Sequence, residues 1–146
     1  MTQLRLVSYP LIATSTMMLV LNSYAVLKND EREEILLADD DISHLSNEMH
    51  GFLVTIQQVT EGIEKDNMNQ VFHAAKASGL SSIKNISGTL KSSLPTEFKK
   101  MGYATRKSFE QLAIDAEQFG DKEHTLSQLN QVLTLCTNCH SKYKVE

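Results

Sequence analysis

The sequence has no tryptophan, only two prolines and only two cysteines among its 146 residues. Pro10 and Pro95 are therefore the only positions at which a missing backbone N–H would interrupt a helix. Strand-like alternation of β-branched residues is also missing, and the long stretches are rich in leucine, alanine, lysine, glutamate and glutamine. A chain of this length suits one domain. We therefore expect an all-α protein.

An excess of basic residues is absent as well. The chain has 14 Lys and Arg residues against 18 Asp and Glu residues, which gives a formal net charge of −4 at pH 7. Domains that bind nucleic acids usually carry a basic patch, and no aromatic residues are interleaved with basic clusters here. We expect no nucleic acid among the partners of this protein.

Both cysteines lie in one pentapeptide near the C-terminus, Cys136-Thr137-Asn138-Cys139-His140. C-x-x-C-H is the attachment signature of a c-type haem. Each thiol adds to one haem vinyl group, and the histidine becomes an axial ligand of the iron. Two intervening residues separate the sulfurs by about one helical turn, which suits two substituents on one porphyrin edge. The motif predicts one covalent haem c, bound by Cys136 and Cys139, with His140 as an iron ligand.

Three other interpretations of the motif agree less well with the sequence. A thioredoxin-like C-x-x-C should lie beside a βαβ pattern, whereas this one ends a long helical run. A structural zinc site needs four ligands, and the other histidines are single and scattered (His44, His50, His73 and His124). A disulfide fits poorly between two cysteines on one helical turn.

The N-terminal segment contains no acidic residue before Asp30. Arg5 precedes a mostly apolar run, and Ser23 and Ala25 are small residues at the two positions that a signal peptidase reads. This pattern is typical of a secretory signal peptide, so we expect residues 1–25 to be removed and 26–146 to form the mature domain. A retained membrane anchor is the alternative, although a membrane span needs about 20 strongly apolar residues. Since bacteria attach haem through thioethers outside the cytoplasm, export agrees with the motif and predicts a periplasmic protein.

Apolar residues at three- and four-residue steps predict four helices in the mature chain. We expect them from Asp39 to a loop at 62–67, from Asp66 or Asn67 to about residue 90, from about 104 to 118, and from Asp121 or Thr125 through the motif. A charged lead-in over 26–37 precedes them, and a short turn over 96–100, closed by Gly102, precedes the third. Among the residues assigned to inner faces are Leu53, Ile83, Phe119, Leu126 and Leu133. Four helices with short connections are typical of an antiparallel bundle.

A helical bundle with a single C-x-x-C-H at its C-terminal end resembles the class II cytochromes c, the cytochrome c prime family. The ending Cys136-x-x-Cys139-His140-x-x-Tyr143-Lys144 is similar to the family's ending, in which an aromatic and then a basic residue follow the motif. The resemblance covers roughly residues 38–146; it is specific at the tail and architectural elsewhere. It implies an antiparallel four-helix bundle with covalent haem on the last helix, thioether bonds at Cys136 and Cys139, and His140 as the proximal ligand.

The resemblance also implies that the first helix supplies the residue on the other side of the iron. This residue is a methionine in six-coordinate members and an apolar residue in five-coordinate members. Met49, the methionine of the first expected helix, lies on its apolar stripe and is the candidate sixth ligand. The alternative role for Met49 is core packing, which is common for methionine. His50 is a rival ligand, but it lies about 100° away from Met49 around a helix.

A single haem in a bundle, without a nucleophile–base pair or a carboxylate dyad, predicts an exported electron carrier rather than an enzyme. Its partners would be redox proteins that the sequence does not identify. The resemblance adds a homodimer as a candidate assembly, and membrane contact is expected only if the N-terminal segment is retained.

Two other functions stay open. The first is a five-coordinate haem protein that binds nitric oxide or carbon monoxide in an apolar pocket formed by Leu45, Phe52 and Ile56. The second is a haem-bearing subunit of a dehydrogenase or another redox enzyme.

Overall fold

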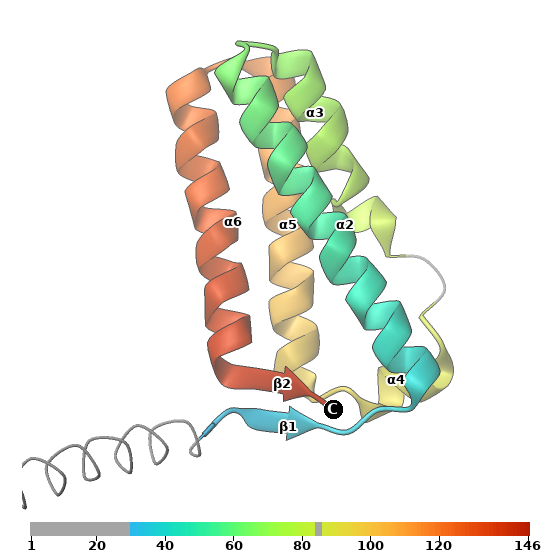
Figure 1. Ribbon diagram of the computed structural model, residues 1–146. Coiled ribbons are helices and arrows are strands. Elements are labelled where there is room, and N and C mark those ends of the chain that lie inside the picture. Colours follow the sequence, from blue (N-terminus) through green and yellow to red (C-terminus); the bar gives the residue numbers. More distant parts are fainter. Residues whose placement is uncertain (1–29, 84–85) are drawn as a thin grey trace, which may run out of the picture. The chain divides into compact units, whose positions relative to one another are not determined.

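The computed structural model describes residues 30–83 and 86–146 (Figure 1). The expected signal peptide over residues 1–25 lies outside the described residues. Residues 32–146 form one compact unit. In chain order it contains β1 (Glu33–Ile35), α2 (Asp39–Glu64), α3 (Met68–Ala77), the 3-10 turn η1 (Leu80–Ser82), α4 (Gly88–Ser93), α5 (Thr96–Gln118), α6 (Lys122–Lys142) and β2 (Tyr143–Val145). The expectation of a mainly helical fold is confirmed, with the addition of one small sheet.

The long helices α5 and α6 run side by side, α2 crosses them at an angle, and the shorter α3 packs on both α2 and α5 (Figure 1). The tight connection between α2 and α3 depends on Gly62. A Cβ atom there would lie 2.7 Å from Cγ2 of Val71, so a larger residue would push α3 away from α2.

The turn between α5 and α6 begins and ends as the sequence predicts. Gly120, one residue beyond the C-cap of α5, has φ +62, a left-handed conformation that glycine adopts without strain. The side chain of Asp121 accepts a hydrogen bond from the backbone N–H of His124 at 2.7 Å and so caps α6. Thr125, the other expected cap, is buried inside the helix.

A buried carboxylate ties α5 to α6 close to this turn. Asp115 accepts hydrogen bonds from the side-chain amides of Gln111 on its own helix and Gln128 on α6, and its Oδ2 lies 3.2 Å from Nε2 of His124. Burial raises the pKa of Asp115, but the hydrogen bonds from His124, Gln111 and Gln128 outweigh this effect and lower the pKa overall.

The second expected helix, from residue 66 or 67 to about residue 90, is wrong as a single element. Asn67 does cap α3, but this helix ends at Ala77. The hydroxyl of Ser78 is buried against that of Thr55, 2.7 Å away, and the carboxylate of Glu110 pairs with Lys76 and accepts from the backbone N–H of Leu80. These contacts with α2 and α5 stabilise a bend that the local sequence does not require.

The third helix begins at Thr96, about eight residues earlier than expected, and continues through Gly102. Pro95 precedes it with φ −56, a value already suited to the start of a helix. A glycine inside a helix costs only about 1 kcal/mol. Burial of Phe98 and Met101 against a small apolar cluster outweighs that cost.

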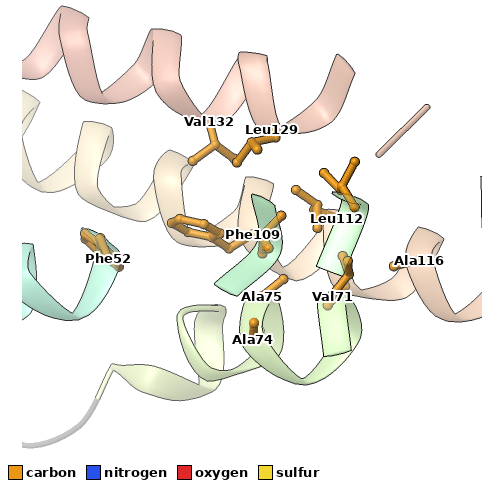
Figure 2. Packing of buried hydrophobic residues seen from close by; sticks show 12 residues of the cluster. Phe52, Val71, Ala74, Ala75, Phe109, Leu112, Ala116, Leu129 and Val132 are labelled. Atoms are coloured by element: carbon orange, nitrogen blue, oxygen red, sulfur yellow. The ribbon is translucent and has the colours of Figure 1, made fainter. Parts of the chain in front are cut away.

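The main core lies between α2, α3, α5 and α6 (Figure 2). Phe109 is its largest fully buried side chain, and its ring stacks on that of Phe52 with centroids 5.5 Å apart. Five large apolar residues expected on inner faces are instead exposed: Leu53, Ile83, Phe119, Leu126 and Leu133. His140, which we expected on the inner face of the last helix, is exposed as well.

The two strands form a small parallel sheet that joins the two ends of the compact unit (Figure 1). Glu33 pairs with Tyr143, and Ile35 pairs with Val145. Ile35 and Tyr143 are both buried in a second apolar cluster with Leu90 and Leu94. The expected charged lead-in is therefore partly a strand, because tertiary contacts with the C-terminal residues supply its hydrogen bonds and its buried face.

None of the helices in the part of the chain that the structure describes is long and apolar enough to cross a membrane.

Candidate functional site

A cavity of about 390 Å³ lies between α2, α5, α6 and the C-terminal strand. α6 contributes Cys136, Cys139 and His140 to its wall, and α2 contributes Met49. All four residues that the sequence singles out thus line one cavity. They come together because Met49 faces inward from the N-terminal half of α2, while the motif lies on the last turns of α6.

The two cysteines are half-buried and link the two apolar clusters. Cys136 packs against the main core and Cys139 against the cluster that contains Tyr143. Burial raises the pKa of both thiols, and the neighbouring Cys136 raises that of Cys139 further. Redox-active C-x-x-C motifs have lowered thiol pKa values, so this environment does not favour a thioredoxin-like function.

No group of three or more His, Cys, Asp or Glu side chains within residues 30–83 and 86–146 is arranged to bind a metal ion directly. A structural zinc ion needs four such ligands. The motif therefore lacks the partners that a zinc site would require in this part of the chain.

Met49 is half-buried and packs against the main core while lining the cavity. Its rival His50 is exposed and is not part of the cavity wall. Of the histidines expected at the surface, His73 and His124 are exposed, whereas His44 is half-buried with its Nε2 atom enclosed. Of the methionine and the two histidines on α2, only Met49 thus lines the cavity.

Arg106, on α5, is a cavity residue that the sequence reasoning missed. It is only 7% exposed. Its Nη2 donates to Oε1 of Glu48 at 2.6 Å, and its Nη1 donates to the carbonyl of Gly102 at 3.3 Å. The guanidinium carbon lies 5.0 Å from the ring centroid of Phe52. Removing one partner of such a buried ion pair typically costs about 3–5 kcal/mol, because the other charge stays buried.

A signal for Arg106 does exist in the sequence. It lies three residues before Phe109 and seven before Ala113, which puts it on the buried stripe of α5. A charged residue on an otherwise apolar stripe is rarely buried without a partner. The partner, Glu48, lies 58 positions earlier in the chain, so the pair itself has no sequence pattern.

The small sheet holds the residues that follow the motif. Tyr143 is 4% exposed, and its ring meets that of Phe98 edge to face with centroids 5.4 Å apart. Nη1 of Arg32 donates to the carbonyl of His140 at 3.4 Å. Lys144 pairs with Glu34 across the sheet. These contacts fix the end of α6 on which His140 lies.

The cavity fits the haem that the motif predicts. Cofactor pockets usually measure about 300–1,000 Å³ and are mostly apolar, with a few polar groups. Here Leu45, Phe52 and Phe98 form apolar wall, two thiols and an imidazole lie on one side, and the Nε atom of Arg106 is buried without a hydrogen-bond partner. Such an atom suits the carboxylate groups that haem carries.

Comparisons of this chain with protein-family models, with curated proteins and with solved structures found no match.

Proposed function

We propose that this protein is an exported monohaem c-type cytochrome that carries electrons and is not an enzyme. Cys136 and Cys139 would bind the haem through thioether bonds, and His140 would ligate the iron. One observation carries the proposal: the three reactive residues of the motif open into the same cavity as Met49 of α2. A motif that matched haem attachment by chance would have no reason to lie on such a cavity.

The proposal assigns distinct roles to the residues of the cavity wall. A bound haem supplies a one-electron iron centre, whose potential depends on axial ligands, burial and hydrogen bonds. His140 offers an imidazole nitrogen, and Met49 offers a thioether, a soft ligand that suits ferrous iron and raises the potential. Leu45 and Phe52, which line the cavity together with Met49, would form its apolar surroundings.

The proposal includes the resemblance to the cytochrome c prime family. In this assignment α2, α3, α5 and α6 correspond to the four antiparallel helices of the family's bundle, and the haem is attached to the last. The mutual packing of these helices around one core supports the assignment. α3 is much the shortest of the four.

Export, a periplasmic location and cleavage after Ala25 belong to the same proposal and rest on the sequence of residues 1–25. The partners would be redox proteins, with a homodimer as the assembly that the family resemblance implies.

The mass of the intact protein, purified from a bacterium that matures c-type cytochromes, tests the proposal. We expect the mass of one added haem, which acidified organic solvent does not extract. The Cys136→Ser/Cys139→Ser double variant should lose covalent haem, whereas Asn138→Ala, a change at an exposed position between the cysteines, should keep it. Native protein without covalent haem would refute the proposal.

A second function follows if Met49 does not bind iron. Leu45 and Phe52 then leave an apolar face beside the cavity, which suits a five-coordinate haem that binds nitric oxide or carbon monoxide. Ile56, the third residue expected there, packs in the core instead. Rapid carbon monoxide binding by the reduced protein would favour this function over the electron carrier.

A further inference from the structure

We propose that Arg106 binds a carboxylate group of the haem in the cavity, so that Arg106 both positions the haem and raises its reduction potential. This inference rests on the proposed function, because the haem propionates are the carboxylates in question. It concerns a residue of α5 that lies outside the C-x-x-C-H motif and outside the expected iron ligands.

The hydrogen bonds of the guanidinium group leave room for an anion. Arginine has five N–H donors in a rigid fork. One donor of Arg106 binds Glu48 and one binds the carbonyl of Gly102. The Nε atom is buried and has no hydrogen-bond partner. A buried donor without a partner is unfavourable. Each Nη nitrogen also keeps one N–H beyond the bonds to Glu48 and Gly102, so the guanidinium has donors left for a carboxylate in the cavity.

Glu48 and Phe52 hold the guanidinium at the cavity, but they do not use all of its hydrogen-bond donors. Glu48 accepts a hydrogen bond from Nη2, and the guanidinium carbon lies over the ring of Phe52. Both residues are on α2, and all three line the cavity. An arginine fixed in this way has lost its side-chain freedom before the ligand binds, so little further ordering is needed when a carboxylate arrives.

The other cations of the cavity wall have different surroundings. Lys144 already pairs with Glu34 at 3.4 Å and with Glu146 at 2.5 Å, and both glutamates are exposed. Arg32 is exposed and donates to the carbonyl of His140. Water screens such surface charges. Of the Lys and Arg side chains among the described residues of the cavity wall, Arg106 is therefore the buried one. Water would screen its interaction with an anion least.

A buried positive charge at a haem carboxylate favours the reduced state, because reduction adds one negative charge to the haem. Glu48 offsets part of the charge of Arg106 in the native protein and stays unpaired when Arg106 is replaced with glutamine. Replacing Arg106 with glutamine should therefore lower the reduction potential. The ratio of reduced to oxidised protein, at a fixed ambient potential, should fall at least tenfold, which corresponds to 59 mV for one electron.

The experiment compares three variants of the haem-loaded protein with the native protein. Arg106→Gln removes the charge and the fork, and Arg106→Lys keeps the charge but not the fork. Lys107→Gln is the matched control, since it removes one positive charge from the adjacent, exposed position of α5. The readouts are intact mass, reduction potential, and the propionate-bending band in the resonance Raman spectrum, which reports hydrogen bonding to the haem carboxylates.

We expect all three variants to carry haem. Arg106→Gln should lower the ratio at least tenfold and shift the Raman band. Arg106→Lys should shift the band but change the ratio less than threefold, and Lys107→Gln should match the native protein in both readouts. If Arg106→Gln does not fold, the Glu48→Gln/Arg106→Gln variant, which leaves no unpaired carboxylate, is compared with Glu48→Gln, and the same band shift is expected.

Two results contradict the proposal, and they are distinct. If the variants carry haem but Arg106→Gln, or the double variant against Glu48→Gln, leaves the band unshifted, Arg106 does not bind a propionate and the proposed function stands. If the native protein carries no covalent haem, the proposed function itself is wrong, and the inference about Arg106 falls with it.

Discussion

Replacement of Met49 separates its two roles, iron ligation and core packing. Met49 is half-buried, packs against the main core and lines the cavity. Met49→Leu keeps the side-chain volume nearly constant, and such changes usually cost less than about 1.5 kcal/mol even in a full core. Met49→Ala removes most of the side chain. The cost in a full core is about 2–5 kcal/mol, and we expect about half of it at this partly exposed position.

If Met49 ligates the iron, the native protein should be low-spin when reduced and should bind carbon monoxide slowly, because the ligand must displace sulfur. Both Met49→Leu and Met49→Ala should then be high-spin, bind carbon monoxide fast and have a lower potential, since methionine ligation raises it. Only Met49→Ala should lose appreciable stability in urea. Met68→Leu is the matched control: Met68 packs against the same core but is not part of the cavity wall.

The measurements are visible spectra of the oxidised and reduced proteins, carbon monoxide binding rates and urea unfolding curves. Native protein that is already high-spin and binds carbon monoxide readily would rule out ligation by Met49. The same conclusion would follow if Met49→Leu had the same spectrum as native protein and the Met68→Leu control. Met49 would then be a core residue, and gas binding would become the better proposal.

Three further predictions concern stability and processing. Phe109→Ala should lower the free energy of unfolding by about 3–5 kcal/mol, measured in urea, because Phe109 is fully buried at the centre of the core; an equal loss in Tyr103→Ala, at an exposed residue, would contradict this reasoning. The pKa of Asp115 is lower in the folded than in the unfolded protein, so ionised Asp115 contributes to the free energy of unfolding. This contribution is complete above the ordinary aspartate pKa, about 3.9. It is lost as the pH falls below that value toward the lower pKa of the folded state. The stability difference between native protein and Asp115→Asn should therefore shrink in acid, and a difference that does not depend on pH between neutrality and pH 2 would show that another group is responsible. N-terminal sequencing of the exported protein should begin at Val26, and a sequence that starts at Met1 would indicate a retained anchor.

The sequence by itself determined the helical class, several helix ends and the candidate haem residues. The capping side chains of Asn67 and Asp121 and the left-handed Gly120 act within a few residues of their own positions. Local interactions of this kind leave a readable pattern. The C-x-x-C-H motif is readable for the same reason, since one helical turn contains all of its reactive atoms.

Apolar periodicity placed the core less accurately. Phe109 and Val132 are buried as the stripes predict, but Leu126 and Leu133 of the same α6 stripe are exposed. The apolar stripe of a helix shows which side faces the core only to within about 100°, the rotation between successive residues. Where neighbouring helices diverge, the edge of that stripe meets solvent instead of a partner.

Only the tertiary structure decided what surrounds the motif. The pairing of β1 with β2 joins residues more than 100 positions apart, and the bend after Ala77 depends on Glu110 of another helix. Met49 and the motif share a cavity because the fold puts α2 and α6 on two of its walls. Arg106 likewise meets Glu48 only through the packing of α5 against α2. Burying a charge is costly unless it is paired, and the partner here comes from a distant part of the sequence.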